Sequence, residues 1–317
     1  LSTVLKTQTT AYSSDSAYIT RRIIGLPTET KLWQGTTSGT LMSKVTYAYD
    51  EGNLTGTDPV QNISPVQHDN TNYSSSFVTG RGLVTTVKRW DATDPTDSND
   101  AVTTTMKYNT AGAVVSKTTP WYSTYTRTVK IAYADDFNSS PGVTTYAYPT
   151  TITDPAGNSS TVKYRYDIGA NVEATSPAPA GQTYGKKSKR LFDSIGRLDR
   201  QSVYVNTTEK AYTRYEYPSN GIQAKTFTTV IDVSGSTSGP DTADEVLSES
   251  WTDGAGRVRG SRTEHPGSTG GWTATQTEYN VLGQVYRTSV PTEVSVSSPY
   301  DPSTWTAAGD DYTRGWI

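Results

Sequence analysis

The 317-residue sequence contains no cysteine, only two methionines and only two histidines. Without cysteine, neither a disulfide framework nor a thiolate metal site can form. No apolar run reaches the roughly 18 residues that a membrane-spanning helix needs, so we expect no membrane span. The net charge is −3 and the pI is near 5.5. The chain therefore lacks the excess of basic residues that is typical of a general nucleic-acid-binding protein. The lack of cysteine also fits a large exported bacterial β-protein.

The abundant residue types favour strands. Tyrosine outnumbers phenylalanine by 22 to 4, and serine and threonine are frequent throughout. Val, Thr, Tyr and Trp favour strands, whereas Ala, Leu, Glu, Lys and Met favour helices. No long stretch repeats apolar residues with a helical period of 3.6. The sequence therefore predicts an all-β protein, long enough to bury a sizeable core.

One short stretch shows how these strands are connected. Leu191–Leu198 reads L-F-D-S-I-G-R-L, with Asp193 and Gly196 at the first and fourth positions of a type I turn. The aspartate side chain can accept hydrogen bonds from the backbone ahead of it, and glycine readily takes the positive φ that follows. We expect Asp193 to shape this turn and Arg197 to lie along the face of the return strand.

The same spacing recurs along the chain. At seven predicted turns Asp or Asn stands two or three residues before Gly, often with an aliphatic residue two positions after the Gly. Recurrence at this frequency indicates a repeat of hairpins rather than isolated turns. We interpret residues 1–317 as a single array of repeated antiparallel hairpins, clearest at 45–60 and 142–290. The predicted turn residues are Asp50 and Gly52, Asn109 and Gly112, Asp154 and Gly157, Asp167 and Gly169, Asp193 and Gly196, Asp253 and Gly256, and Asn280 and Gly283.

Three further local expectations follow from the pattern. Leu1–Ile24 is predicted to hold two or three strands, and Thr144–Tyr148 one more. Lys44–Asp50 is predicted to be a strand that turns at once, so that its return strand begins at Asn53. The tyrosine rings are expected to pack while their hydroxyls stay in water.

Several of these motifs resemble Rhs or YD repeats. The resemblance covers roughly Val45 to Val285 and is most specific in the later half. It rests on Tyr47-Ala-Tyr49-Asp50, Asp154-Pro-Ala-Gly157-Asn158, Tyr164-Arg-Tyr166-Asp167, Phe192-Asp193 with Gly196-Arg197-Leu198, and Gly256-Arg257-Val258.

The resemblance implies a hairpin ribbon that spirals into a hollow shell, as in bacterial Rhs toxins, the cocoon of insecticidal toxin complexes and the teneurin barrel. In that family the shell encloses a C-terminal toxin, and a core segment after the repeats cleaves itself with aspartates. Here Asp301-Pro302 is followed by Ser-Thr rather than by Gly-Leu. Neither the autoprotease nor a toxin is therefore assigned. The start at Leu1 and the end at Ile317 lead us to expect a fragment of a longer protein.

The candidate catalytic and ligand-binding groups have simpler structural interpretations. His68 and His265 fall in predicted loops, and no Gly-x-Ser-x-Gly elbow accompanies them. Gly181–Ser188 has one residue too few between its glycines for a phosphate-binding loop. A loop followed by a solvated basic strand, Lys186–Arg190, explains that stretch better. This basic strand also lacks the interleaved aromatic residues that are typical of a site for single-stranded nucleic acid.

Acidic clusters and tryptophans offer the remaining candidates. The acids could hold calcium or act as glycosidase carboxylates, but the spacing of an EF-hand is missing and surface acids are the simpler interpretation. Exposed tryptophans at loop tips could stack on sugars, although packing under a loop is the simpler alternative. The acidic candidates are Asp94, Asp97, Asn99, Asp100, Asp135, Asp136, Glu245 and Glu249, and the aromatic ones are Trp33, Trp121, Tyr122, Trp272 and Trp305.

The sequence thus predicts a non-catalytic structural segment of a large exported Rhs/YD-repeat protein, secreted by or displayed on a bacterium. Its partners would be neighbouring domains of the same polypeptide, among them an enclosed toxin. The alternative is a cell-surface adhesin or carbohydrate-binding module that uses Trp and Tyr tips to bind glycans. An enzyme is the third hypothesis, and no convergent acid, base or nucleophile supports it. No catalytic, cofactor-binding or metal-binding residue is assigned.

Overall fold

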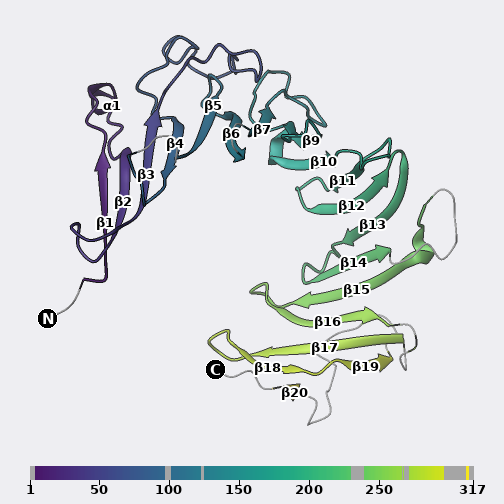
Figure 1. The fold of residues 1–317 in the computed structure, drawn as a ribbon. Coiled ribbons are helices and arrows are strands. Elements are labelled where there is room, and N and C mark those ends of the chain that lie inside the picture. Colours follow the sequence, from purple (N-terminus) through teal and green to yellow (C-terminus); the bar gives the residue numbers. More distant parts are fainter. Residues whose placement is uncertain are drawn as a thin grey trace. The chain divides into compact units, whose positions relative to one another are not determined.

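The computed structural model describes residues 4–96, 101–122, 125–229, 239–265, 267, 271–295 and 312–313. The chain divides into two compact units, residues 1–170 and 171–317. Both units consist of antiparallel strands joined in chain order (Figure 1). Within the described residues, the longest helix has five residues, so none could cross a bilayer. The predicted all-β class built from antiparallel hairpins is confirmed.

The first unit is a run of strands in which each pairs with the next, from β1–β2 to β8–β9. A short helix follows the first strand, and a 3-10 turn follows the last. The elements are β1 (Lys6–Tyr12), α1 (Ser16–Thr20), β2 (Pro27–Gln34), β3 (Leu41–Tyr49), β4 (Val84–Trp90), β5 (Val102–Tyr108), β6 (Val114–Tyr122), β7 (Tyr125–Ala132), β8 (Thr151–Thr153), β9 (Ser159–Arg165) and η2 (Tyr166–Ile168).

The second unit continues in the same manner, from β10–β11 to β17–β18. In addition, β17 pairs with β19 and β18 pairs with β20. The elements are β10 (Ala170–Thr175, starting at the last residue of the first unit), β11 (Lys186–Phe192), β12 (Leu198–Val205), β13 (Thr208–Glu216), β14 (Gln223–Thr229), η3 (Thr242–Asp244), β15 (Glu245–Thr252), β16 (Val258–Glu264), β17 (Gly271–Tyr279), β18 (Val285–Ser289), β19 (Thr292–Ser295) and β20 (Tyr312–Thr313).

The first 24 residues differ from expectation. They contain one described strand, β1, followed by the helix α1 rather than by further strands. Asp15 begins the helix, because its carboxylate accepts the backbone N–H of Ala17 at 2.8 Å. Tyr18, on this helix, is buried and packs edge-on against Tyr49 of β3, with ring centroids 6.2 Å apart. An N-cap and one buried aromatic thus outweigh the strand preference of the neighbouring residues.

Two other local predictions were wrong because an aspartate carboxylate, Asp50 in one case and Asp135 in the other, binds the backbone of a loop. No return strand begins at Asn53, since the chain makes a long excursion over 50–83 before β4 pairs with β3. Residues 144–148 form no strand either. There the Asp135 carboxylate accepts the backbone N–H groups of Thr145 (2.6 Å) and Tyr146 (2.8 Å), and Tyr146 has a positive φ of 50°. A carboxylate that binds a loop backbone in this way replaces strand pairing.

The apolar core is much smaller than the length of the chain predicts. Among the described residues, buried polar and charged side chains outnumber buried apolar and aromatic ones by 14 to 7. In the second unit, the described strands pack edge to edge with their neighbours, and no strand or helix forms a second layer over either face. Each face must therefore satisfy its own side chains, which makes polar pairing within the face the main source of order. The buried apolar and aromatic side chains are Tyr18, Leu54, Ile63, Val115, Tyr212, Trp251 and Ala274.

Tyrosines at the ends of strands supply part of this order. Six of them donate their hydroxyl to a backbone carbonyl at or near the start of the preceding strand, at 2.7 to 3.0 Å. Each bond therefore ties the end of one strand to the beginning of its neighbour. The six tethers are Tyr49 to Pro27, Tyr108 to Val84, Tyr133 to Val114, Tyr164 to Pro149, Tyr217 to Leu198, and Tyr279 to Val258.

The expectation that these hydroxyls stay in water was wrong. The side chains are half-buried, and the hydroxyl is the donor that reaches a carbonyl left free where the strand pairing stops. Alternation could identify the packing face of the rings, but the partner carbonyl lies 15 to 24 residues earlier in the chain. Only the paired structure brings the two together.

Removing one tether should measurably destabilise the second unit. Tyr217→Phe keeps the ring but leaves the Leu198 carbonyl without its donor, so we expect a loss of about 1 kcal/mol in the free energy of unfolding. Tyr184→Phe is the control, because Tyr184 lies in a loop and is 51% exposed. Urea denaturation of both variants decides the matter, and equal stabilities would show that the tether contributes nothing.

The tethers also predict a loss of stability in alkali. Burial raises the pKa of Tyr108, Tyr133, Tyr164 and Tyr217 above the ordinary value near 10. A raised folded-state pKa means that the contribution is complete below about pH 10 and is lost as the pH rises through the folded-state pKa. We expect the urea midpoint to fall above about pH 10 as phenolate absorbance increases. A midpoint unchanged at about pH 12 would contradict this.

Candidate functional site

The turn that begins at Asp193 has an internal hydrogen-bond network. Asp193 Oδ1 accepts the backbone N–H of Ile195 (3.0 Å) and of Arg197 (2.8 Å). Asp193 N–H donates to the Arg197 carbonyl, and Gly196 N–H donates to the Asp193 carbonyl. Gly196 has a φ of 85°, and the strand register shifts beside it, which is a type I turn followed by a glycine bulge.

The arginine after the glycine closes this turn. Arg197 Nε donates to Asp193 Oδ2 at 2.7 Å, and its guanidinium lies 4.3 Å above the ring of Tyr217. The side chain therefore turns back onto its own hairpin and meets the tethering tyrosine of the next one, instead of lying along the strand face. This Asp–Arg–Tyr unit joins a turn to the following hairpin.

A second copy of the unit has the same geometry. Arg257 Nε donates to Asp253 Oδ2 at 2.8 Å, and its guanidinium lies 4.6 Å above the Tyr279 ring. Tyr279 in turn donates to the carbonyl of Val258, as Tyr217 does to that of Leu198. The two copies show that the arginine is a component of the repeat, linked to the turn and to the tether at once.

Other copies retain the turn with neutral partners. Asp154 Oδ2 accepts the Asn158 amide at 2.9 Å, and Asn280 Nδ2 donates to Gln284 Oε1 at 3.0 Å. Asn109 is fully buried and accepts the Ala113 N–H at 2.9 Å. The turn at Asp167 and Gly169 is instead a 3-10 turn, in which the Asp167 carboxylate pairs with Arg165 at 2.9 Å.

The electrostatics of these turns favour a structural role. Hydrogen bonds from Arg197 and Arg257 hold the pKa of Asp193 and Asp253 below the usual range. Both carboxylates are thus ionised at neutral pH and engaged by their own turn. A general acid would need the opposite shift, toward a raised pKa.

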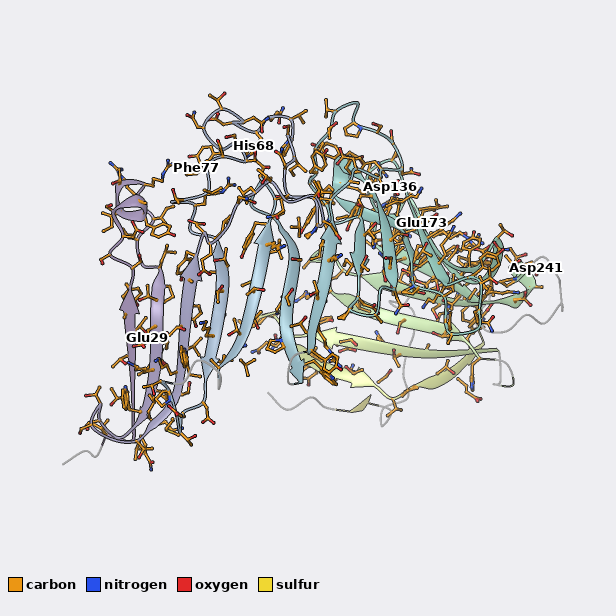
Figure 2. All side chains as sticks on the ribbon, turned by 45° about the horizontal axis from the view of Figure 1, so that its top comes forward. Glu29, His68, Phe77, Asp136, Glu173 and Asp241 are labelled. Carbon is orange, nitrogen blue, oxygen red and sulfur yellow. The ribbon has the colours of Figure 1, made fainter. Side chains whose placement is uncertain are left out.

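Asp50 has a different geometry from the turn aspartates. Its Oδ2 accepts the backbone N–H of Arg81 (2.8 Å) and of Gly82 (2.9 Å), and its Oδ1 accepts that of Leu83 (2.9 Å). Asp50 itself has a positive φ of 56°. The carboxylate therefore joins the two ends of the excursion 50–83, whose residues His68 and Phe77 are labelled in Figure 2. The dipeptide Tyr-Asp alone does not distinguish this clamp from a hairpin turn.

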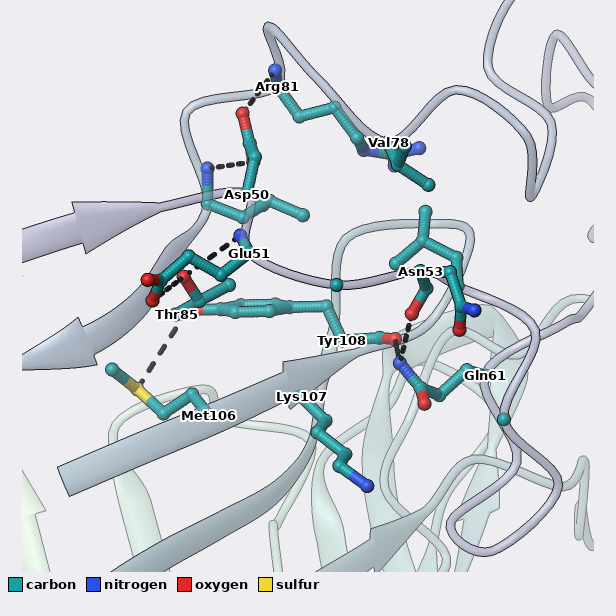
Figure 3. Close-up of a pocket in the computed structure, with 14 residues that line it drawn as sticks. Asp50, Glu51, Asn53, Gln61, Val78, Arg81, Thr85, Met106, Lys107 and Tyr108 are labelled. Carbon is teal, nitrogen blue, oxygen red and sulfur yellow. Dashed lines mark hydrogen bonds between the residues drawn. The ribbon is translucent and has the colours of Figure 1, made fainter.

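A cavity of about 340 Å³ lies beside Asp50 (Figure 3). Its polar groups are engaged by the surrounding loop. Glu51 Oε2 accepts the hydroxyls of Thr85 (3.1 Å) and Thr86 (2.5 Å). Gln61 is buried, and its amide donates to the carbonyls of Asn53 (3.1 Å) and Tyr108 (2.8 Å). These hydrogen bonds hold the excursion against β5, so the cavity has the character of a structural joint.

One face of the second unit is lined by buried ion pairs. The side chains of Glu249 and Arg262 are 2% and 4% exposed, and the two are joined by a short ion pair. Gln223 donates to Glu249 at 3.0 Å, and Lys225 lies 3.4 Å from the same carboxylate. The guanidinium of Arg262 also lies 4.1 Å above the ring of Trp272.

Glu245 occupies the same face with its own partners. Arg214 donates from Nε and Nη2 to its two oxygens, each at 2.7 Å, and the Tyr212 hydroxyl donates at 2.7 Å. The hydrogen bonds from Arg214 lower the pKa of Glu245. The expectation that Glu245 and Glu249 are surface acids was therefore wrong. Both carboxylates are buried and bind arginine.

The opposite face of the second unit carries hydroxyl groups. Ser248 pairs with Thr263 at 3.0 Å, and Ser261 with Thr275 at 2.9 Å, across neighbouring strands. Because successive strand residues point to opposite faces, these residues alternate along the strands with the charged ones. The sheet thus has one face lined by ion pairs and one face rich in hydroxyl groups. On the hydroxyl-rich face, Arg190 also donates to Gln201 of the neighbouring strand at 3.3 Å.

The remaining sequence candidates do not come together. His68 bonds Asn70 at 2.8 Å, whereas His265 is exposed at the end of β16. Lys187 and Lys189 lie 3.6 and 3.9 Å from Glu173.

The acidic candidates of the first unit are also separate. Asp94 accepts the Thr96 hydroxyl at 2.9 Å, while Asp97, Asn99 and Asp100 fall outside the described residues. Asp135 clamps the loop at 145–146, and Asp136 pairs with Lys163 at 3.5 Å. Over the described part of the chain, no group of three metal-ligating side chains gathers.

The candidate tryptophans divide into two kinds. Trp33 and Trp272 lie within β2 and β17 and are half-buried, so Trp272 is not at a loop tip. Trp121 is 62% exposed near the β6–β7 tip, with the Arg127 guanidinium 3.0 Å from the centre of its ring. The side chain of Tyr122 and all of Trp305 fall outside the described residues.

Comparisons with known proteins assign the chain to no family. No protein-family model matches it, and no curated protein matches its sequence. In fold it is similar to TcdB2-TccC3-Cdc42 in a crystal structure (TM-score 0.41, 10% identity, 91% of this chain and 16% of that chain). It is also similar to a porin-like protein from Bacteroides uniformis (TM-score 0.29, 10% identity, 90% and 87%) and to the Photorhabdus luminescens Tc holotoxin pore (TM-score 0.27, 10% identity, 91% and 19%). The chain spans about a sixth of the first of these.

Two glycines in one turn allow the turn geometry to be tested. Gly254 and Gly256 both have open space around the position of an added Cβ, but only Gly256 has a positive φ, of 77°. We expect Gly256→Ala to cost about 1 kcal/mol, because a side chain strains this backbone region. Gly254→Ala is the matched control and should be neutral or slightly stabilising. Equal effects in urea denaturation would show that the bulge is not required.

Proposed function

We propose that this chain is a non-catalytic wall segment of a large exported bacterial protein of the Rhs/YD-repeat kind, which encloses or presents a neighbouring domain. The observation that carries the proposal is the single-layer sheet of the second unit, in which each face pairs its own polar groups. Such a sheet can separate what lies on its two sides without a core of its own.

The repeat supports this function because it lets a sheet grow without limit. Each hairpin is joined to the next by backbone pairing, by a tyrosine tether and, in two copies, by an Asp–Arg–Tyr unit. The stability of a linear array is approximately a sum of repeat and neighbour terms. Length can therefore be added by further repeats, which is what a large wall requires.

The charge pattern suits a wall that does not bind the domain it encloses. On the charged face, Glu245 is paired with Arg214 and Glu249 with Arg262. On the hydroxyl face the Ser and Thr pairs are uncharged, and Arg190 donates to Gln201. Because opposite charges are paired locally, the face presents little net field to an enclosed polypeptide. An enclosed domain would meet a polar surface with few unsatisfied groups.

The proposed lack of catalysis rests on the state of the ionisable groups. Glu245 and Glu249 are the two glutamates considered above as glycosidase carboxylates. Each forms an ion pair with an arginine of another strand. A general acid–base pair needs one carboxyl with a raised pKa, whereas the pKa of Glu245 is lowered. These groups serve the sheet rather than a reaction.

Protection of a neighbouring domain tests the proposed function. The polypeptide that contains this chain would be digested with a broad-specificity protease, and the survival of its C-terminal domain compared with that of the same domain made alone. We expect strong protection, and faster digestion in the Tyr217→Phe, Tyr279→Phe variant, while Tyr184→Phe behaves as wild type. Digestion at the rate of the isolated domain would contradict enclosure. Tight glycan binding that disappears in Trp121→Ala would instead favour the adhesin.

A further inference from the structure

Four hairpin turns of the second unit lie along one rim of its sheet. They follow β11, β13, β15 and β17, which run in the same direction because each strand is antiparallel to the next. We call this edge the signature rim, because it contains the Asp193, Asp253 and Asn280 turns. Its exposed apolar tips are Ile195, Ile222, Val281 and Leu282.

These tips are far more exposed than apolar residues need to be. Ile195 is 73% exposed, Leu282 79%, and Val281 fully so, while Ile222 is 46% exposed. The turn places no apolar demand on them. The third residue contributes only its backbone N–H to the Asp or Asn side chain, as Ile195 and Leu282 do at 3.0 Å. A polar residue would therefore serve the turn equally well.

The apolar preference at this position is general. Five described Asp/Asn-x-x-Gly turns are closed by a hydrogen bond from the glycine N–H to the Asp or Asn carbonyl. In all five the residue before the glycine is apolar and exposed. Neighbouring turns share it, so a chance surface leucine is a poor explanation. On the opposite rim, by contrast, the described β12–β13 turn consists of Asn206 and Thr207. The apolar third residues are Ala111, Ala156, Ile195, Ala255 and Leu282.

The charges of the rim narrow the choice of partner. Asp193 is paired with Arg197 and Asp253 with Arg257, and Asn280 with Gln284 forms a neutral turn. No surplus of one sign remains in these turns to attract a nucleic acid or an anionic lipid headgroup. The rim is therefore apolar at its tips and electrically neutral between them, which favours an apolar protein edge as partner.

The spacing of the tips indicates the form of that edge. Successive turns on one rim are separated by two strands, which is about 9.5 Å for strands 4.7–4.9 Å apart. A partner that meets every tip must repeat at the same interval. A second strip of the same hairpins does so, and two copies related by a twofold axis would place each tip against the other rim.

We propose that the signature rim docks against the signature rim of a second copy of this chain. This inference rests on the proposed wall function, since a wall wider than one strip needs contacts between rims. The contact is apolar, with Ile195 on the first of the four turns, Ile222 on the second, and Val281 and Leu282 on the last.

Self-association of the full chain tests the proposal. In sedimentation equilibrium we expect a concentration-dependent dimer, and the Ile195→Ser, Leu282→Ser variant should weaken it at least tenfold, because each copy contributes both tips. Val205→Ser is the matched control, since Val205 is 45% exposed but lies toward the opposite rim, and it should dimerise as wild type does. Circular dichroism establishes that each variant keeps its strands.

Three outcomes would overturn the proposal. A wild-type chain that stays monomeric at all concentrations shows that the rim has no such partner. Equal dimerisation of the double variant places the contact elsewhere. Binding to neutral phosphatidylcholine vesicles that depends on Ile195 and Leu282, without dimers, makes the rim a lipid contact. In each case, protease protection of the neighbouring domain would still measure the wall function separately.

Discussion

In the described part of the second unit, no second layer covers the sheet. The sheet must therefore satisfy its polar side chains within its own faces, and the other features follow from this constraint. Buried charges without partners would cost several kcal/mol each. Glu249 therefore binds Arg262 on the adjacent strand, and Glu245 binds Arg214 two strands away. Hydroxyls on the other face pair across strands. The tyrosine tethers donate hydrogen bonds to backbone carbonyls at strand ends, where the strand pairing stops. Order thus comes from polar pairing between neighbouring strands more than from an apolar core.

The same constraint links the turn to the wall. In Asp193–Arg197 the turn is closed by its own arginine, and that arginine stacks on Tyr217, which tethers the next strand. One unit therefore fixes the turn, the strand end and the neighbouring hairpin together. Because the pattern needs only the preceding repeat, it can continue along the chain. It also leaves the third turn residue free to be chosen for contacts outside the sheet, and that residue is apolar.

The strands and most turns could be predicted from alternation and from the spacing of Asp and Gly, because both are local signals. The destination of Asp50 could not, since Tyr49-Asp50 followed by glycine reads as a hairpin, whereas its carboxylate binds backbone more than 30 residues later. The burial of Glu249 also escaped prediction, because it depends on Arg262 in the next strand. The partners of the tyrosine hydroxyls are equally remote in sequence. The sequence alone therefore could not show the side-chain partners that lie on a neighbouring strand or a distant loop.

The heat capacity change on unfolding tests this description most directly. It scales mainly with the apolar surface that unfolding exposes, and a compact protein of this length would show about 4–5 kcal/mol/K. A single-layer sheet held by polar pairs exposes less apolar surface and more polar surface, which lowers the change. Differential scanning calorimetry of the full chain should therefore give a value well below that range. A value within it would mean that an apolar core, rather than polar pairing across the faces, holds the sheet together.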